Sequence, residues 1–279
     1  MQTIHRLSEL SSAIAQLRGR GARIAFVPTM GALHQGHMAL INAAKTVADH
    51  VIASIFVNPM QFGPNEDLDS YPRPKTADIR YLTDAGVALL WAPNVPTMYP
   101  DGYATKVTVA GLDTMLCGAA RPGHFDGVGT VVAKLFNQVH PDIALFGEKD
   151  WQQLAIIRRM EADLNFGIKI VGVPTVREAD GLALSSRNAF LSKEQRSAAT
   201  GLPSAMNAAC LAMQNGVTPA AAIERAKGAI LSAGFASIDY LELRDGASLA
   251  LLDHAAQGAR LFAAARIGTT RLIDNIAFG

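Results

Sequence analysis

The chain has 279 residues, of which 49% are hydrophobic and 18% charged, so it is long enough for one large domain or for a large domain with a smaller partner. This ordinary globular composition excludes disorder and a collagen-like architecture. Lysine and arginine number 25 against 24 acidic residues, so the net charge of +1 supplies no bulk field for a polyanion, and we expect no nucleic-acid partner without a local basic patch.

Cysteine content and the amino-terminal segment favour a reducing cytoplasm. Cys117 and Cys210 lie far apart and outside any Cys-x-x-Cys spacing, which supports neither a disulfide framework nor a zinc–thiolate site. The first nine residues lack the apolar run of a secretory signal. The longest uncharged run, residues 197–223, is interrupted by glycine, proline and amide residues, so we expect two alanine-rich helices there and no membrane span.

Short apolar runs alternate with longer amphipathic segments from residue 23 to about residue 174. This alternation predicts an α/β domain with a parallel sheet and crossover helices. Most of the runs are apolar on both faces, as expected for central strands that are covered on both sides. We predict strands at residues 23–28, 51–57, 87–93, 142–147 and 169–174. We predict helices at residues 37–48, 76–85, 127–138 and 151–163.

The composition changes after Arg187, where alanine-rich helical segments are followed by strand-like runs. Strands are predicted at residues 238–243, 260–267 and 270–276. Ser192 followed by Gln195 forms a capping box, and Thr218 with Pro219 supplies an N-cap and a first-turn proline, so both helix starts are marked. We therefore predict a Rossmann-like α/β domain over residues 1–184 and a smaller C-terminal α+β domain over residues 185–279.

The strongest chemical signal is VPTMGALHQGHMALI at residues 27–41, in which a strand runs through a glycine-containing turn into a helix. His34 and His37 lie one helical turn apart at the predicted helix start. Unpaired backbone N–H groups and the positive end of the helix dipole favour a phosphate there, and two imidazoles can add donors. The alternatives are a metal pair, which would need a further ligand, or two incidental surface histidines. The segment is not a Walker loop, since no Gly-Lys-Ser/Thr follows.

A second segment, FGEKDWQQLAIIRRM at residues 146–160, also runs from a strand end into a helix. Lys149 is a cation that can reach phosphate oxygens, and Asp150 can cap the helix or accept a hydrogen bond from a ribose hydroxyl. Carboxyl ends of parallel strands form the ligand crevice in open sheets, so we expect both segments to face one site. The alternative is an ordinary capped and solvated helix start.

A polar cluster, DGLALSSRN at residues 180–188, lies at the predicted domain boundary. Ser185, Ser186 and Arg187 supply hydroxyl groups and a permanent cation, which suit closure over developing phosphate charge. The alternative is an ordinary linker. Two further polar loops, residues 56–73 and 121–128, are candidates for specificity.

Six motifs occur in an order that resembles the pantothenate synthetase family of the nucleotidyltransferase superfamily. They are PTMGALHQGH, FVNPMQF, YPR, RPGHFDGV, GEKDWQQL and LSSRN. His-x-Gly-His alone would indicate only the superfamily. Two positions depart from the family pattern, because Leu184 stands where Met is also familiar and Trp151 stands where Tyr is expected. Both keep apolar bulk.

The resemblance implies an ATP-dependent ligase that condenses pantoate with β-alanine to pantothenate through a pantoyl adenylate, releasing AMP and pyrophosphate. It implies Mg²⁺ bound with ATP, mainly through phosphates and water and without a protein metal cage, and a cytoplasmic homodimer. Two rival classes stay open on the sequence alone. One is another adenylyl or cytidylyl transferase, and the other is a nucleotide-sensing or RNA-binding protein that has lost turnover.

The same resemblance assigns site residues. His37 would be the general acid, His34 a phosphate partner, and Lys149 and Arg187 cations for the phosphates. ATP contacts are expected at Met30, Gly31, Ala32, Leu33, His34, Gln35, Gly36, His37, Gly147, Glu148, Lys149, Asp150, Val176, Leu184, Ser185, Ser186 and Arg187. Contacts to pantoate or β-alanine are expected at Gln61, Gln153, Asn58, Tyr71, Arg121 and His124.

Overall fold

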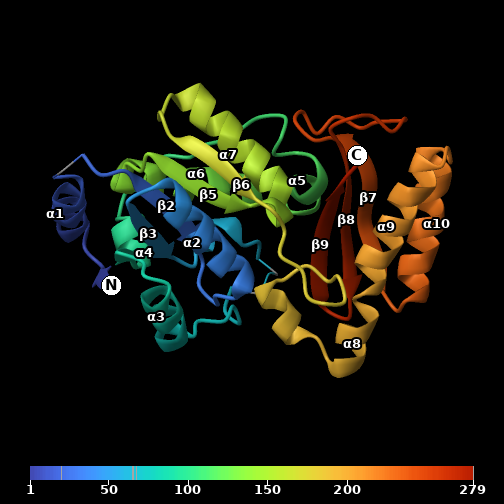
Figure 1. Cartoon of the computed structure of the whole chain (residues 1–279), viewed down its shortest axis with the longest axis horizontal. Helices are drawn as coiled ribbons and strands as arrows, with labels where there is room; N and C mark the ends of the chain where they lie inside the picture. Colours follow the sequence, from blue (N-terminus) through green and yellow to red (C-terminus); the bar gives the residue numbers. More distant parts are fainter. Residues whose placement is uncertain (20, 65, 67, 279) are drawn as a thin grey trace. The chain divides into compact units, whose positions relative to one another are not determined.

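The computed structural model describes residues 1–19, 21–64, 66 and 68–278, and its chain divides into two compact units (Figure 1). The first unit contains Met1–Thr114, Arg121–Glu148 and Gln153–Pro174. The second contains Met115–Ala120, Lys149–Gln152 and the chain from Thr175 onward. The chain therefore passes from one unit to the other after residues 114, 120, 148, 152 and 174.

A six-stranded parallel sheet forms the centre of the first unit, with strand order β1-β4-β3-β2-β5-β6. Its strands are β1 (Gln2–Ile4), β2 (Ile24–Thr29), β3 (His50–Ile55), β4 (Leu89–Trp91), β5 (Ile143–Gly147) and β6 (Lys169–Val173). All five predicted strands are present, and β2 and β3 are buried over most of their length. Strand β1 was not predicted, because of its three residues only Ile4 is buried.

Helices connect these strands, as expected for parallel crossovers. They are α1 (Leu7–Arg18), α2 (Gln35–Val47), α3 (Lys75–Asp84), α4 (Val95–Met98), α6 (His124–Val139) and α7 (Trp151–Leu164), with short 3₁₀ turns η1 (Pro59–Gln61) and η2 (Glu148–Asp150). The four predicted helices are therefore confirmed. Helix α2 packs against β2, β3 and β5. The segments that follow these three neighbouring strands leave the same carboxyl edge of the sheet, where ligands bind in open α/β sheets.

An antiparallel sheet of order β7-β8-β9 forms the second unit together with a helix pair. Its elements are α5 (Leu116–Ala120), η3 (Ser186–Phe190), α8 (Lys193–Ala198), α9 (Gly201–Gln214), α10 (Pro219–Ser232), β7 (Ser237–Asp245), β8 (Ala259–Ile267) and β9 (Thr270–Ala277). Ser192 and Gln195 form the predicted capping box, and the Thr218 side chain caps α10. The three predicted strands are confirmed.

Two short segments from earlier in the sequence are built into this second unit. In one segment, Cys117 Sγ lies 3.1 Å from Tyr240 Oη and accepts from Arg271 Nη1 at 3.3 Å. In the other, Asn275 Nδ2 donates to the Lys149 carbonyl at 2.9 Å. Residues 185–278 all belong to this unit. The division into a domain of residues 1–184 and a smaller C-terminal domain of residues 185–279 stays a prediction.

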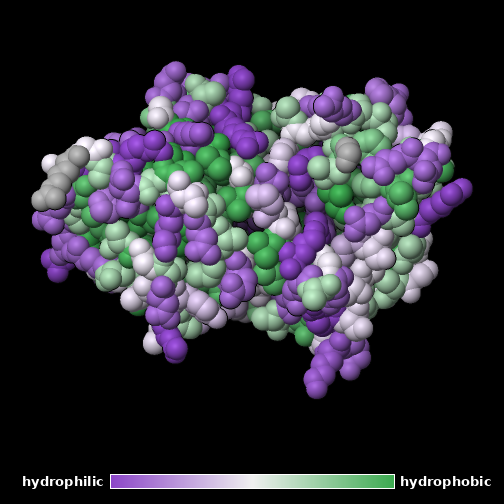
Figure 2. Space-filling view, viewed as in Figure 1, coloured by the Kyte–Doolittle hydropathy of each residue, from purple (hydrophilic) through white to green (hydrophobic). Residues whose placement is uncertain are grey.

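The uncharged run at residues 197–223 forms α9 and the start of α10. None of the helices in the described part of the chain is long and apolar enough to span a membrane. Hydrophilic and hydrophobic residues are interspersed over the face seen in Figure 2. Exposed large apolar side chains, such as Leu211, Leu231 and Leu251, come from different elements of the second unit.

Candidate functional site

Both histidines of the His-x-Gly-His segment lie at the start of α2. His34 is the N-cap, and its Nδ1 accepts from the Gly36 N–H at 3.1 Å. The His34 N–H in turn donates to His37 Nδ1 at 3.2 Å, and the two ring centroids are 4.2 Å apart. Because Nδ1 accepts in both rings, a neutral imidazole carries its proton on Nε2 in each. The helix start therefore fixes the tautomer of both side chains.

This tautomer favours an anion over a metal ion. A neutral imidazole whose Nδ1 already accepts an N–H has no lone pair on Nε2 for a metal. An Nε2–H is instead a donor for a phosphate oxygen, at the helix end where the dipole favours negative charge. Within the described residues, no group of three or more His, Cys, Asp or Glu side chains is gathered in a way that could hold a metal. The geometry therefore favours the phosphate interpretation of His34 and His37.

The loop between β2 and α2 has an unusual backbone that Asp78 supports. Gly31 has φ +87° and Ala32 has φ +51°. Asp78, on α3, accepts from the Ala32 N–H at 2.9 Å and from the Leu33 N–H at 2.8 Å. Its side chain is buried, and burial raises the pKa of the carboxyl although the two backbone N–H bonds act in the opposite direction. Asp78 was not expected from the sequence, because an aspartate in a first helical turn normally marks only favourable interaction with the helix dipole.

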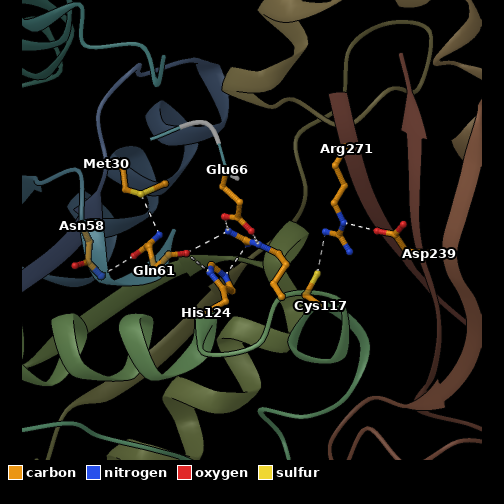
Figure 3. Close-up of polar contacts among 9 residues, drawn as sticks. Met30, Asn58, Gln61, Glu66, Cys117, His124, Asp239 and Arg271 are labelled. Atoms are coloured by element: carbon orange, nitrogen blue, oxygen red, sulfur yellow. Dashed lines mark hydrogen bonds and ion pairs between the residues drawn. The ribbon is translucent and has the colours of Figure 1, made fainter. Parts of the chain in front are cut away.

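Gln61 is held in η1 by contacts from several segments of the first unit (Figure 3). Its Oε1 accepts from Asn58 Nδ2 at 3.0 Å, and its Nε2 donates to Met30 Sδ at 3.0 Å. Asn58 is buried and also donates to the Gly127 carbonyl, while its Oδ1 accepts from Tyr99 Oη at 2.8 Å. A residue expected at ATP, Met30, thus lies beside a residue expected at pantoate.

Arg121 and His124 both donate to the Gln61 carbonyl, and Figure 3 shows His124 beside Gln61. His124 Nδ1 donates to the Gln61 carbonyl at 2.8 Å, and His124 Nε2 accepts from Arg121 Nη1 at 3.0 Å. Arg121 also pairs with both carboxylate oxygens of Glu66, at 2.7 and 2.5 Å. Burial raises the pKa of Glu66, but the hydrogen bonds and charge of Arg121 outweigh it and hold the pKa below its usual value. No sequence pattern marked Glu66.

The remaining substrate candidates of the first unit have different surroundings. Tyr71 is buried and packs edge-on against Phe62, with ring centroids 5.8 Å apart. Gln153 is partly exposed near the start of α7. The loop from Asn58 to Tyr71 contains Asn65 and Asp67, which lie outside the described residues.

Gln152, which precedes Gln153 in the segment of residues 146–160, has a structural role in the second unit. It is buried, its Oε1 accepts from the Cys117 N–H at 2.9 Å, and its Nε2 donates to the Met115 carbonyl at 2.7 Å. The amide therefore ties the start of α7 to α5.

Lys149 belongs to the second unit, where strand β9 holds its main chain. Asn275 is buried and donates to the Lys149 carbonyl, and Asn275 Oδ1 accepts from Arg260 Nε at 2.8 Å. The Lys149 side chain is 20% exposed, with Nζ 3.9 Å from an Asp150 carboxylate oxygen. Gly147 ends β5 and Glu148 opens η2 in the first unit. The sequence carried no signal for Asn275.

The polar cluster before α8 is also ordered by local hydrogen bonds. Ser185 is the N-cap of η3, and its Oγ accepts from the Arg187 N–H at 3.2 Å. The Leu184 N–H donates to the Val176 carbonyl at 3.0 Å, so these two residues lie side by side. Ser186 and Arg187 form the first turn of η3.

An ion pair between half-buried Arg177 and buried Asp274 lies next to this cluster and anchors it to β9. Arg177 Nη1 and Nη2 donate to the two Asp274 carboxylate oxygens at 2.7 and 2.8 Å, and only 2% of the Asp274 side chain is exposed. Arg177 directly follows Val176 and forms a bridge to Ala183. Neither Arg177 nor Asp274 was expected from the sequence, because the two residues are 97 positions apart along the chain.

Comparison with known proteins gives this arrangement a family. A sequence model described as pantoate-beta-alanine ligase matches residues 2–277. The chain belongs to the pantoate-beta-alanine ligase family. Family members include pantothenate synthetases of Sphingopyxis alaskensis, 60% identical over the whole of both chains, and Novosphingobium aromaticivorans, 58% identical over 100% of this chain and 99% of the relative.

Solved structures of this family have the same fold. A pantothenate synthetase from Thermus thermophilus is 47% identical and superposes with a TM-score of 0.94, over 100% of this chain and 99% of that one. A pantoate-beta-alanine ligase from Francisella tularensis, described as complexed with beta-gamma ATP and beta-alanine, is 34% identical with a TM-score of 0.85 over 99% of this chain and 97% of that one. The expected α/β fold with a smaller α+β part is thereby confirmed.

Proposed function

We propose that this protein condenses pantoate with β-alanine, using ATP and releasing AMP and pyrophosphate. The observation that carries the proposal is the family match over residues 2–277, together with a relative 60% identical over the full length of both chains. The Francisella tularensis relative, described with an ATP compound and beta-alanine, supports the same substrates.

The reaction proceeds in two steps through a mixed anhydride. A pantoate carboxylate oxygen attacks the α-phosphorus of ATP and pyrophosphate leaves, which gives pantoyl adenylate. The β-alanine amine then attacks the acyl carbon, the C–O bond to AMP breaks, and the amine loses a proton. Activation replaces a poor leaving group by AMP, so the protein mainly has to align the reactants and neutralise charge.

The start of α2 supplies charge neutralisation in the first unit. His34 and His37 offer Nε2–H donors, and the helix dipole adds positive potential at the same place. As pyrophosphate leaves, negative charge grows on its oxygens, so donors fixed in advance stabilise the transition state more than the ground state. His37 is the proposed proton donor.

Gln61 has an amide suited to pantoate, which carries hydroxyl groups and a carboxylate. Its Nε2–H now donates to the Met30 thioether, and sulfur is a weak acceptor. A substrate oxygen can therefore replace the sulfur at little cost. Gln153 is the second proposed pantoate contact, while Asn58, Arg121 and His124 support Gln61 through the contacts described above.

In the second unit, Lys149, Ser185, Ser186 and Arg187 are proposed to bind the ATP phosphates. Lysine acts as a point charge and arginine as a planar donor. Mg²⁺ is proposed to enter with ATP, coordinated mainly by phosphate oxygens and water, as is usual for this ion at nucleotide sites.

Two broader properties are also proposed. A homodimer is the expectation from the family resemblance. A cytoplasmic location fits a biosynthetic ligase, and it agrees with two buried cysteines that are both free thiols.

The test is pantothenate formation by the purified protein from ATP, pantoate and β-alanine. His37→Ala should lose most turnover, while His254→Ala, which removes an exposed histidine of the second unit, should keep it. ATP–pyrophosphate exchange with a panel of carboxylic acids separates pantoate from other acids. Exchange with another acid and none with pantoate would overturn the substrate assignment, and full turnover in His37→Ala would remove its proposed role.

A further inference from the structure

Asp78 is a buried carboxylate that the two-step reaction does not use. Only 2% of the residue is exposed, and both of its oxygens accept backbone N–H groups, Oδ2 from Ala32 and Oδ1 from Leu33. These two amides lie in the loop that precedes His34. The carboxylate comes from α3, in a different part of the sequence, so it ties the loop to a separate element.

The backbone of this loop needs such support. Gly31 and Ala32 both have positive φ, and an alanine at φ +51° adopts a conformation that L residues visit rarely. Two charge-assisted hydrogen bonds to consecutive amides hold this conformation, together with the Gly31 N–H, which donates to Thr29 Oγ1 at 3.2 Å. The loop ends at His34, which is the N-cap of α2 and whose ring lies against that of His37.

Asp78 also packs tightly against the loop. A Cβ at Gly31 would lie 3.0 Å from Asp78 Oδ2 and 3.2 Å from Ile55 Cγ2. The absence of a side chain at residue 31 is therefore what lets the carboxylate approach the two amides. Direct contacts therefore link Asp78, the loop and the two histidines within the first compact unit.

We propose that Asp78 is a positioning residue for adenylation, which acts through the Ala32 and Leu33 amides to set where His34 and His37 meet the ATP phosphates. This inference rests on the proposed function and deepens it. It also refines the expected ATP contacts. The Ala32 and Leu33 N–H groups donate to Asp78, so we expect the phosphates to be bound by groups at the start of α2. Burial also raises the pKa of the Asp78 carboxyl, and groups with perturbed pKa values cluster at functional sites.

Asp78→Asn tests the proposal with little change of shape. The amide has one oxygen, so one backbone N–H keeps an acceptor while the other faces an NH₂ group. We expect kcat of ATP–pyrophosphate exchange to fall roughly 10- to 100-fold, as for a small misplacement of reacting groups. The KM for pantoate should change little. The second half-reaction, measured with supplied pantoyl adenylate and β-alanine, should fall far less, since no pyrophosphate departs in it.

Asp84→Asn is the matched control, because Asp84 lies on the same helix with its side chain 70% exposed and 3.7 Å from Arg80. It should keep both half-reactions. Gly31→Ala is a second probe that pushes on the Asp78 oxygen, and Gly102→Ala is its control, with φ +80° and open space around the added Cβ. Gly31→Ala should reproduce the selective loss of exchange, and Gly102→Ala should not.

Amide NMR gives a readout that is independent of turnover. The Ala32 and Leu33 amide protons should move upfield in Asp78→Asn and stay in place in Asp84→Asn, since a charged acceptor is replaced. Equal losses in both half-reactions, or unchanged exchange, would overturn the inference, as would unmoved amide signals. Failure of the wild-type protein to form pantothenate would instead refute the proposed function and would leave the amide result standing.

Discussion

His34 and His37 each use Nδ1 to accept a backbone N–H, and this decides which ring atom can act on a ligand. The spacing of the two histidines at a helix start could be predicted from the sequence. Their tautomer could not, because it depends on which amide each ring meets. Asp78 was hidden for a similar reason, since its two partners are 45 and 46 residues away and no local pattern marks the pairing.

Lys149→Ala is predicted to slow adenylation far more than it weakens pantoate binding, because the ammonium group serves charge that develops on the phosphates. We expect kcat of ATP–pyrophosphate exchange to fall about 100- to 1,000-fold, in line with loss of one preorganised donor. The KM for pantoate should stay near that of the wild type. Lys169→Ala, at an exposed position at the start of β6, is the control. Equal losses in kcat and in pantoate affinity would contradict the prediction.

Glu66→Gln is predicted to change how the stability of the protein depends on pH. Burial raises the pKa of Glu66 and the contacts with Arg121 lower it more, so the folded-state pKa lies below the usual 4.5. The pair therefore stabilises the fold above about pH 4.5, and that contribution is lost as the pH falls through the lowered folded-state pKa. At pH 7 the variant should be less stable by about 1 kcal/mol.

Urea unfolding across pH 7 to pH 3 measures this effect, and the difference between wild type and variant should shrink toward the acidic end. Glu9→Gln removes an exposed carboxylate 3.6 Å from Arg6 and serves as control. Its unfolding free energy should follow that of the wild type at every pH. A constant difference for Glu66→Gln across the series would refute the assignment.

Helix α6 approaches η1 so closely that one glycine decides their packing. A Cβ at Gly127 would lie 2.3 Å from the Met60 carbonyl oxygen, and the Gly127 carbonyl accepts from Asn58. The predicted helix began at this glycine, whereas α6 starts three residues earlier at His124. The sequence predicted the helix but not the contact of its first turn with η1, because a close contact between backbones has no characteristic sequence pattern.

Gly127→Ala is therefore predicted to push α6 and η1 apart. We expect a loss of about 1–3 kcal/mol in unfolding free energy from overpacking and a raised KM for pantoate as Gln61 shifts. Gly228→Ala is the matched control, because this glycine of α10 has open space at its Cβ. That variant should be slightly more stable, by up to about 1 kcal/mol. Chemical denaturation and steady-state kinetics of both variants provide the test, and an unaltered Gly127→Ala would contradict it.

The sheet itself was predictable because its central strands are apolar on both faces. Strands β2, β3 and β5 are buried on both sides, and this pattern is visible in the sequence. Edge strand β1 was missed, since three residues of which only Ile4 is apolar carry too little periodicity. In the second unit, β7 extends to Asp245 through two half-buried residues beyond Leu243, where the prediction ended it.

At the scale of the whole molecule, three separate segments of the chain belong to the second unit: residues 115–120, residues 149–152 and the chain from Thr175 onward. A boundary in the sequence can mark only the last of these segments, which begins at Thr175, whereas the composition changes only after Arg187. The two earlier segments are held there by contacts of single side chains such as Cys117 and Gln152, and the sequence gives no sign of the partners of these side chains. Fold class could be predicted from the alternation of apolar runs and amphipathic segments, whereas this interleaving of segments required three-dimensional contacts.

A fragment of residues 175–279 is predicted to be less stable than the same region of the full chain. It lacks residues 115–120 and 149–152, so Tyr240, Arg271 and Asn275 lose the partners described above. Hydrogen exchange of β9 amides should be faster in the fragment than in the full chain, by at least tenfold if about 1.4 kcal/mol of local stability is lost. Equal protection would show that the two short segments add nothing to this unit.

Both thiols of the protein lie in the second unit, Cys117 against Tyr240 and Arg271 and Cys210 within α9, where burial raises its pKa. The first unit contains no cysteine. Reaction with a thiol-specific reagent therefore reports on loosening of the antiparallel sheet and its helices, where both thiols are buried. The rate at which the two native thiols react therefore measures how often the second unit opens, and no label has to be engineered.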